Sequence, residues 1–272
     1  MTFRAACVQL RSSDDVAENI RETVTLVREA AARGASFVAT PENTTLMAPD
    51  SVAKLARSFD EAQDPALPVF SALAKELNIW LLIGSLAIKV SDTKTANRSF
   101  LFAPDGGIAA RYSKIHLFDV ELASGESYRE SHTVAGGDRA VVAKTPWGMV
   151  GLTICYDVRF PQLYRGLAQK GAFLFTVPSA FTVPTGAAHW HVLLRARAIE
   201  NGAFVIAPAQ GGLHANGRKT YGHSLIVSPW GDVLAEAQSD PGVIVADIDP
   251  ELSKQAREKV PNLQHDRAFT GP

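Results

Sequence analysis

Cys155 is the residue in this sequence that is best placed for nucleophilic catalysis. It ends the apolar run Met149–Cys155, which predicts a strand, and Pro161 opens a predicted helix a few residues later. A thiol at such a junction lies near backbone N–H groups and the positive end of a helix, which favour the thiolate. The second cysteine, Cys7, lies inside a predicted strand and is expected to be structural. Cys155 is therefore the candidate nucleophile.

Glu42 and Lys114 supply the two other groups that a cysteine nucleophile needs, a proton acceptor and an oxyanion donor. Glu42 follows the predicted strand Phe37–Thr40, and Lys114 ends the predicted strand Ile108–Lys114. A solvated surface charge is the alternative for either residue taken singly. If the three strands are neighbours in one sheet, Glu42, Lys114 and Cys155 converge on its carboxyl edge, where open α/β sheets place their sites.

The histidines offer a rival mechanism, a papain-like peptidase in which an imidazole activates Cys155. None of them has a partner fixed by local spacing. His189 and His191 lie two apart on a predicted helix, whereas a helical two-histidine metal site needs a spacing of four. No cysteine pair, phosphate loop or dinucleotide fingerprint occurs, so no metal and no cofactor are expected. The candidate bases are His116, His189, His191, His214 and His223.

Short apolar runs alternate with helical patterns, and hairpin signals interrupt the alternation. This arrangement predicts an α/β fold with mixed sheets covered by helices. A helix capped by Ser13 or Asp14 is expected to end at Gly34, residues 115–138 predict a loop, and two Pro-Trp-Gly hairpins hint at internal duplication. Other predicted helices are Pro68–Leu77, Pro161–Gly171 and Ala187–Asn201. The remaining predicted strands are Phe3–Leu10, Ile79–Ile88, Ser99–Ala103, Ala140–Thr145, Phe173–Val177, Ala203–Ala207, Ser224–Ser228, Asp232–Ala237 and Val243–Asp249.

Composition limits the other classes of function. The chain has 272 residues, 46% of them hydrophobic, and a net charge of −1, so a large core is expected and nothing attracts nucleic acid or an anionic membrane. We see no signal peptide, no membrane span and no disulfide framework in a chain with two cysteines. A single domain over residues 1–272 in the reducing cytoplasm is therefore expected.

Three segments resemble the glutamate, lysine and cysteine motifs of the nitrilase superfamily of carbon–nitrogen hydrolases. They are Pro41–Asn43, Tyr112–Asp119 and Gly151–Pro161. The resemblance covers nearly the whole chain, and the lysine and cysteine motifs in this order are the specific part. It implies a four-layer α-β-β-α sandwich that dimerises through helices. Further matches are Pro178–Phe181, His189–Trp190, Arg195–Asn201 and Tyr221–Ser224.

The resemblance also implies a role for each residue. Glu42 would be the general base that deprotonates Cys155 and later the attacking water, and Cys155 would form a thioester. Lys114 and the backbone N–H of Tyr156 would stabilise the oxyanion. Many members have a second glutamate between the lysine and the cysteine, and Glu130 matches that position. It would orient Lys114 or help to position the substrate, unless it is only a loop charge.

Within the superfamily, the chain looks most like the deaminated glutathione amidase branch and the related omega-amidases. The segments Ala209–His214 and Arg218–Ser224 look more like the first branch. Both branches act on the amide of a short 2-oxo acid, whose carboxylate needs a cationic partner. Nitrile hydrolysis is disfavoured because Tyr-Asp, and not Trp-Glu, follows the cysteine. The cationic candidates are Arg159, Arg195 and Lys219.

The expected activity is therefore cysteine-dependent hydrolysis of a small linear carboxamide by water. Deaminated glutathione is the expected substrate, and 2-oxoglutaramate or a similar dicarboxylic monoamide, the substrate class of omega-amidases, is the alternative. A catalytically silent binding subunit is the alternative from another class, and the intact set of Glu42, Lys114 and Cys155 argues against it. A homodimer is also expected, because the helices near 155–171 and 189–201 have wide apolar arcs that something must cover. The apolar residues are Leu163, Tyr164, Leu167, Trp190, Leu193 and Leu194.

Overall fold

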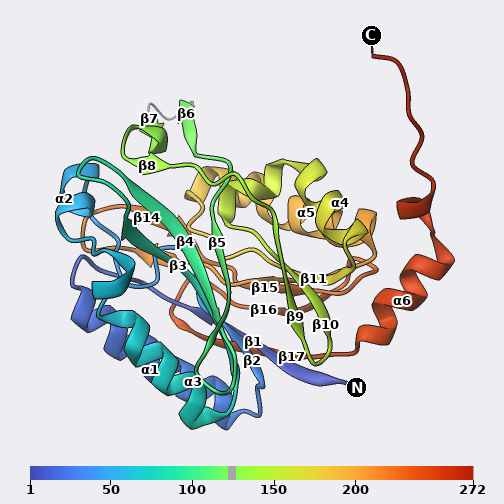
Figure 1. Cartoon of the computed structure of the whole chain (residues 1–272), viewed down its shortest axis with the longest axis horizontal. Coiled ribbons are helices and arrows are strands. Elements are labelled where there is room, and N and C mark those ends of the chain that lie inside the picture. The colour runs from blue at the N-terminus through green and yellow to red at the C-terminus, as the bar shows by residue number, and fades with distance from the viewer. Residues whose placement is uncertain (122–126, 272) are drawn as a thin grey trace.

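The computed structural model describes residues 1–121 and 127–271 and shows two facing β-sheets with helices on their outer sides (Figure 1). Helices α1 (Val16–Ala32) and α3 (Ala66–Leu77) cover one sheet, and helices α4 (Pro161–Gln169) and α5 (Val183–Asn201) cover the other. The predicted α-β-β-α order is therefore confirmed. Among the described residues, no helix combines the length and the apolar character needed to cross a membrane.

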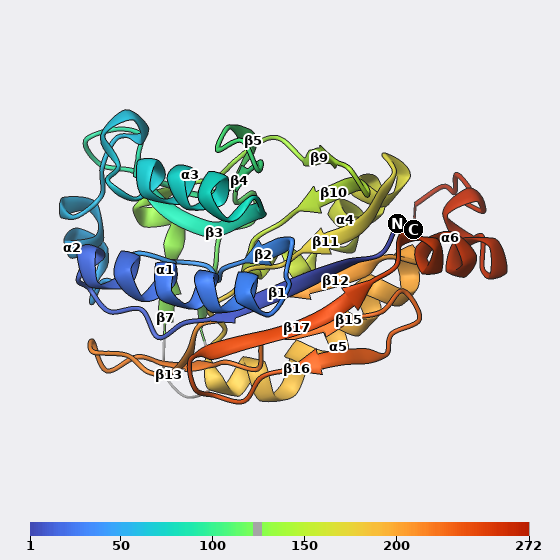
Figure 2. The ribbon, with the colours of Figure 1, turned by 90° about the horizontal axis from the view of Figure 1, so that it is seen from below.

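The first sheet has seven strands within the described residues. Its first and last strands in sequence, β1 and β17, lie side by side (Figure 2). The strand that comes last along the chain therefore pairs with the strand that comes first. In order across the sheet the strands are β17 (Gly242–Ile248), β1 (Phe3–Gln9), β2 (Phe37–Ala39), β3 (Trp80–Lys89), β4 (Thr95–Phe102) and β5 (Ile108–Ser113), with β8 (Val134–Ala135) beside β4.

The second sheet repeats the pairing pattern of the first. Starting from β17 or from β9, the pairings are antiparallel, parallel, parallel, antiparallel and antiparallel. The two sheets therefore share one order of strand pairings, as the hint of internal duplication suggested. The Pro-Trp-Gly hairpins do not mark this repeat, because they join β9 to β10 and β15 to β16, which occupy different places in that order. The strands in order are β9 (Val141–Thr145), β10 (Gly148–Leu152), β11 (Ala172–Thr176), β12 (Phe204–Ala207), β15 (Leu225–Val227) and β16 (Val233–Glu236).

Side-chain alternation along β1 shows how one strand serves two interfaces. Phe3, Ala5 and Cys7 belong to the core between the two sheets, whereas Ala6 and Val8 belong to the core under α1 and α3. All five side chains are buried, because residues of opposite parity on a strand face opposite sides of the sheet. A central strand covered on both sides therefore appears in the sequence as a continuous apolar run.

Some local predictions are wrong or incomplete. Asp15, and not Ser13 or Asp14, caps α1 by accepting a hydrogen bond from the Glu18 backbone N–H at 2.9 Å. The expected loop 115–138 contains strands of its own, with residues 122–126 lying outside the described residues. The additional elements are α2 (Ser51–Ala56), β6 (Asp119–Glu121), β7 (Ser127–Arg129), β13 (Gly211–Leu213), β14 (Lys219–Tyr221) and α6 (Pro250–Lys259).

The apolar residues expected at a subunit interface are mostly buried inside the chain itself. Their side chains pack in the core between the second sheet and its helices, so they need no partner subunit. The large apolar side chains that α5 does expose are Val183, Val192 and Ile199, at 41%, 68% and 52%. Leu163, Tyr164, Leu167, Trp190 and Leu194 are the buried residues, and Leu193 packs partly buried against them.

Gly84 on β3 permits the close approach of the chain that follows β2. A Cβ atom at residue 84 would lie 2.0 Å from the Thr40 carbonyl oxygen and 2.5 Å from that of Pro41. These are backbone atoms, so no side-chain rotation relieves the contact. The Gly84 N–H also donates to the Thr40 hydroxyl at 3.0 Å. The position of residues 40–42 therefore depends on a glycine in the neighbouring strand.

We predict that Gly84→Ala lowers the free energy of unfolding by about 1–3 kcal/mol, the usual range for overpacking. Gly166→Ala is the matched control. Gly166 lies at an exposed position of helix α4, and a Cβ there would meet nothing within 4 Å. The control is expected to be stabilised by about 0.5–1 kcal/mol. Urea denaturation followed by circular dichroism measures both, and equal stability of the two variants would contradict the packing argument.

Candidate active site

Glu42, Lys114 and Cys155 lie together, but their strands are not neighbours in one sheet. Glu42 follows β2 and Lys114 follows β5, both in the first sheet with β3 and β4 between them, whereas Cys155 follows β10 in the second. The expectation that the three residues converge on the edge of a single sheet is therefore wrong. The site forms where strands of two facing sheets end at the same end of the sandwich, and the three side chains line one cavity.

Lys114 is a buried cation held by two carboxylates. Its Nζ lies 2.9 Å from Glu42 Oε1 and 2.9 Å from Glu130 Oε2, and its side chain is 2% exposed. Burial alone would lower the pKa of Lys114, but the charges of Glu130 and Glu42 outweigh it and hold that pKa well above its ordinary value. Lys114 therefore carries a positive charge in a site that largely excludes water.

Glu130 belongs to this cluster although it lies in the segment expected to be a loop. It forms the second ion pair of Lys114, and its Oε2 accepts the Phe118 backbone N–H at 2.7 Å. Burial raises the pKa of Glu130, but the positive charges of Lys114 and Lys54 outweigh it and the net pKa is lowered. Glu130 is thus an anion that fixes Lys114 and ties it to the segment after β5.

Asn97 completes the cluster and was missed by the sequence analysis. Its Nδ2 donates to Glu42 Oε1 at 2.8 Å and to Glu130 Oε1 at 3.2 Å, so it bridges the two carboxylates. The predicted strand began at Ser99, whereas β4 begins at Thr95. The alternation of Thr95, Asn97 and Ser99 in a buried strand is the signal that could have identified it, since buried polar side chains must find partners.

Cys155 does not end a strand as expected. β10 ends at Leu152, and Cys155 begins a 3₁₀ turn with φ of 50°, a backbone conformation that residues other than glycine rarely adopt. The Cys155 N–H donates to the Pro178 carbonyl at 2.9 Å, which helps to hold the turn. Such strained backbone at a nucleophile is typical of a turn that presents the side chain to a substrate.

The surroundings of Cys155 oppose the thiolate that its position at a turn was expected to favour. Burial and the negative charge of Glu42 raise the pKa of Cys155 far above its usual range, and Lys114 opposes them only in part. Cys155 is thus a neutral thiol at rest, beside the Glu42 carboxylate. A carboxylate that accepts the thiol proton during attack is placed beside the group that needs it.

Asp157 connects the cysteine turn to the lysine segment. It is fully buried, and its Oδ2 accepts the Ile154 backbone N–H at 2.9 Å and the Tyr112 hydroxyl at 2.6 Å. Its Oδ1 accepts the His116 backbone N–H at 3.1 Å. One carboxylate therefore fixes the residues before Cys155 relative to the residues on both sides of Lys114.

Polar contacts also fix the Glu42 backbone. Gln210 Nε2 donates to the Glu42 carbonyl oxygen at 3.0 Å, and the Asn43 N–H donates to Ser85 Oγ at 2.9 Å. The Thr44 hydroxyl donates to the Pro41 carbonyl at 2.7 Å. Elements from both sheets hold this turn, so the Glu42 carboxylate is positioned by its surroundings before any substrate binds.

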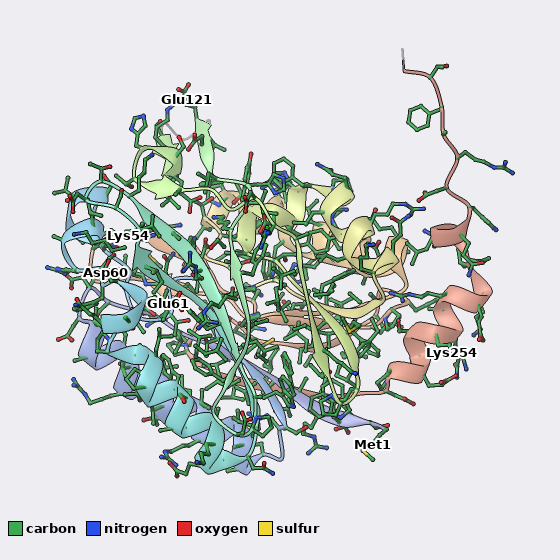
Figure 3. The ribbon with its side chains drawn as sticks, in the orientation of Figure 1. Met1, Lys54, Asp60, Glu61, Glu121 and Lys254 are labelled. Carbon is green, nitrogen blue, oxygen red and sulfur yellow. The ribbon has the colours of Figure 1, made fainter. Side chains whose placement is uncertain are left out.

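The cavity above the cluster has a volume of about 790 Å³ and a cationic lining. Two of the three proposed carboxylate partners, Arg159 and Lys219, line it, as does Tyr156. The third, Arg195, is contradicted as a partner of the substrate carboxylate. Its Nε donates to the Gly231 carbonyl at 2.7 Å, and it is not among the residues that line the cavity. Cations that the sequence analysis missed are Lys54, which α2 carries (Figure 3), Arg129 and Arg218.

The histidines considered as papain-like bases are bonded to other groups. His116 pairs with Asp157, His189 with Arg159, and His214 with Ser12 and Thr220. His191 and His223 both face Glu236. The titratable groups whose charges act most strongly on the Cys155 thiol are instead Glu42 and Lys114.

Comparison with known proteins identifies the class. Residues 4–258 match the family model described as carbon–nitrogen hydrolase, and the chain belongs to that family. It is therefore a hydrolase of carbon–nitrogen bonds, as the motifs implied.

Named relatives narrow the comparison. A deaminated glutathione amidase from Synechocystis is 42% identical over 269 residues, which are 97% of each chain. The crystal structure of the C. elegans NitFhit protein matches with a TM-score of 0.91 and 35% identity over 98% of this chain, which spans 65% of that one. A glutamate-to-glutamine mutant of an amidase from Nesterenkonia sp. AN1 is 26% identical over 95% of this chain and 98% of its own, with a TM-score of 0.80, and its structure shows the result of Michael addition of acrylamide at the active-site cysteine.

We predict opposite shifts of the Cys155 pKa in two variants. Glu42→Gln removes the negative charge that raises this pKa and should lower it, whereas Lys114→Met removes the positive charge that lowers it and should raise it further. The ultraviolet absorbance of the thiolate during a pH titration measures both shifts. Subtracting the same variant with Cys155→Ala removes the contributions of tyrosines and Cys7. Shifts of the same sign in both variants would show that Cys155 does not sense these charges.

Proposed function

We propose that this chain is a cysteine-dependent amidase that hydrolyses deaminated glutathione through a thioester on Cys155. The observation that carries the proposal is that Cys155 and Glu42 line one cavity with a buried Lys114 ammonium, which two carboxylates keep charged. Such a set provides a nucleophile, a base and a fixed positive charge. The relatives named deaminated glutathione amidase support the choice of substrate.

The first half of the reaction forms the acyl-enzyme. Glu42 accepts the thiol proton as Cys155 Sγ attacks the amide carbon, and the carbonyl oxygen becomes negative. Lys114 and the backbone N–H of Tyr156 stabilise that oxygen. The carbon–nitrogen bond then breaks, and the departing amine takes the proton from Glu42. A thioester between the substrate acyl group and Cys155 remains.

The second half releases the acid. Glu42 accepts a proton from water as the water oxygen attacks the thioester carbon, and the same groups stabilise the second oxyanion. The carbon–sulfur bond breaks, the thiolate takes the proton back, and the carboxylic acid leaves. Glu130 and Asn97 act by positioning, because they hold Lys114 and Glu42 in place through both halves.

The cavity supports a substrate with more than one carboxylate. Deaminated glutathione has a 2-oxo acid at one end and a glycine carboxylate at the other, and the lining includes Arg159, Lys219 and Lys54 among its cations. A volume of about 790 Å³ also suits a tripeptide-sized molecule better than the smaller 2-oxoglutaramate of omega-amidases. The free, buried cysteines fit a reducing compartment, so we propose a cytoplasmic enzyme of one domain over residues 1–272.

A comparison of kcat/KM for deaminated glutathione and 2-oxoglutaramate tests the substrate. Deaminated glutathione is expected to be preferred by at least tenfold, because its two carboxylates can each bind a cationic side chain of the cavity, whereas 2-oxoglutaramate has one carboxylate. Cys155→Ala should lose turnover with unchanged circular dichroism, and Cys7→Ala is its matched control. A preference for 2-oxoglutaramate would indicate the omega-amidase activity. Turnover within tenfold of wild type in Cys155→Ala would remove the nucleophile from the proposal.

We also propose a homodimer through helix α5. Val192 and Ile199 are exposed on this helix, and Trp230, 58% exposed, adjoins Gly231, where a Cβ would lie 2.6 Å from Ile199 Cδ1. Exposed apolar groups gathered in this way are typical of an interface. Light scattering should give the mass of a dimer, and that of a monomer for the double variant Val192→Asp, Ile199→Asp. Val52→Asp, on α2, is the control, and a monomeric wild type would contradict the proposal.

A further inference from the structure

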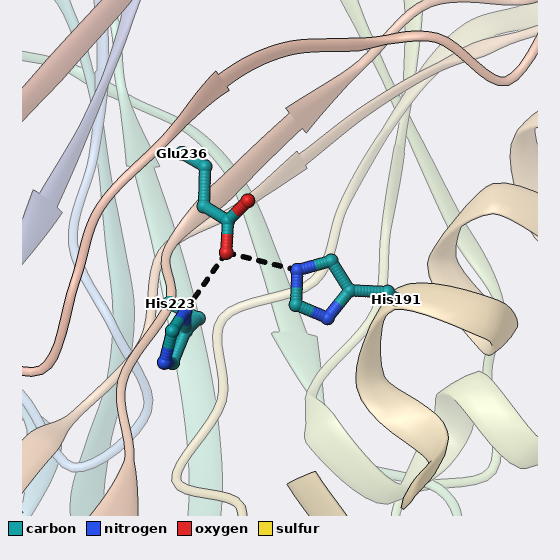
Figure 4. A group of neighbouring side chains, drawn as sticks. All are labelled: His191, His223 and Glu236. Atoms are coloured by element: carbon teal, nitrogen blue, oxygen red, sulfur yellow. Dashed lines mark hydrogen bonds and ion pairs between the residues drawn. The ribbon is translucent and has the colours of Figure 1, made fainter. Parts of the chain in front are cut away.

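Three potential metal ligands meet on the surface of the second sheet. His191 of α5, His223 of the segment before β15 and Glu236 of β16 come from separate parts of the sequence (Figure 4). One ligand atom from each lies within 4.8 Å of the others. Glu236 Oε1 is 3.0 Å from His191 Nε2 and 2.8 Å from His223 Nδ1. Both imidazoles thus direct a nitrogen at the same carboxylate oxygen.

His223 is held in this orientation by its surroundings. Its φ is 54°, in the left-handed region that residues other than glycine rarely adopt. Trp190 Nε1 donates to its carbonyl oxygen at 2.7 Å, its own N–H donates to the Gln238 carbonyl at 2.9 Å, and the Tyr221 ring stacks on its imidazole at 4.3 Å. An unusual backbone conformation fixed by three contacts places its Nδ1 toward Glu236.

The helix that carries His191 is fixed relative to the same segment. A Cβ at Gly186 of α5 would lie 2.2 Å from Tyr221 Cγ, so the tyrosine packs directly on the helix backbone. The same Tyr221 ring stacks on His223. The spacing between His191 and His223 is therefore set by packing, as in sites whose surroundings orient the ligands before metal binds.

The donor set selects the class of metal. Two imidazole nitrogens and one carboxylate oxygen suit Zn²⁺ and Co²⁺, whereas Mg²⁺ and Ca²⁺ prefer oxygen ligands. Bonds of about 2.0–2.2 Å in a tetrahedron put ligand atoms about 3.3 Å apart, so the present contacts need only a small opening.

We propose that His191, His223 and Glu236 form a zinc site that ties helix α5 to strand β16, with water as the fourth ligand. The side chains are 33%, 24% and 32% exposed, which leaves that position open to solvent. None of the three is among the described residues that line the Cys155 cavity. The metal therefore joins a strand of the second sheet to a helix that covers this sheet, and takes no part in turnover.

Zinc binding to five matched proteins tests the site. All carry Cys155→Ala, so that the active-site thiol offers no ligand, and equilibrium dialysis measures the bound metal. The parent is expected to bind one zinc per chain, and His191→Ala, His223→Ala and Glu236→Gln should each weaken binding by about tenfold or more. His265→Ala, an exposed histidine near the C-terminus, should bind as the parent does.

Three further measurements complete the test. Cobalt should give the intense visible absorption of a tetrahedral site in the parent and lose it in the conservative variant Glu236→Gln. Zinc should raise the melting temperature of the parent more than that of this variant. Removal of zinc by EDTA should leave the turnover of the wild-type enzyme unchanged. Absence of zinc binding, equal binding by the three ligand variants and the parent, or turnover that depends on zinc would each overturn the proposal.

Discussion

The candidate active site depends on the balance of charge around Lys114. A buried ammonium needs anionic partners, and here it has Glu42 on one side and Glu130 on the other. Burial, and then the negative charge of Glu42, raises the pKa of the adjacent Cys155, and Lys114 opposes them only in part. The resting site thus holds a neutral thiol, a carboxylate free to accept its proton, and a positive charge placed for an oxyanion.

This constraint explains why many contacts of the fold position Glu42, Lys114 and Cys155. Glu42 and Lys114 come from the first sheet and Cys155 from the second, so the cluster exists only while the two sheets face each other. Gly84 lets the Glu42 turn approach β3, and Asp157 binds the cysteine turn to the segment around Lys114. Small errors in these contacts would separate groups that must remain within hydrogen-bond reach.

The sequence predicted the layers and the chemistry better than the spatial relations. Apolar periodicity located most strands and helices, and the motifs singled out Glu42, Lys114, Glu130 and Cys155, which line one cavity. Periodicity could not show that the strands belong to two sheets, because pairing is set by contacts distant in sequence. The same limit hid Asn97, whose partners lie far along the chain, and the group of His191, His223 and Glu236. Burial likewise reversed the expected ionisation of Cys155.

Single-turnover kinetics of Glu42→Gln and Lys114→Met test the central assignment most directly. Substrate is mixed with excess enzyme, amine release reports acylation, and intact-protein mass spectrometry reports the thioester. With Glu42 as base and Lys114 as fixed cation, Glu42→Gln should slow acylation and deacylation together, so that little thioester accumulates. Lys114→Met should slow the same steps by about 10²–10³ through loss of an oxyanion donor. Near-normal turnover in Glu42→Gln with an inactive Lys114→Met would contradict the account and make the lysine the base.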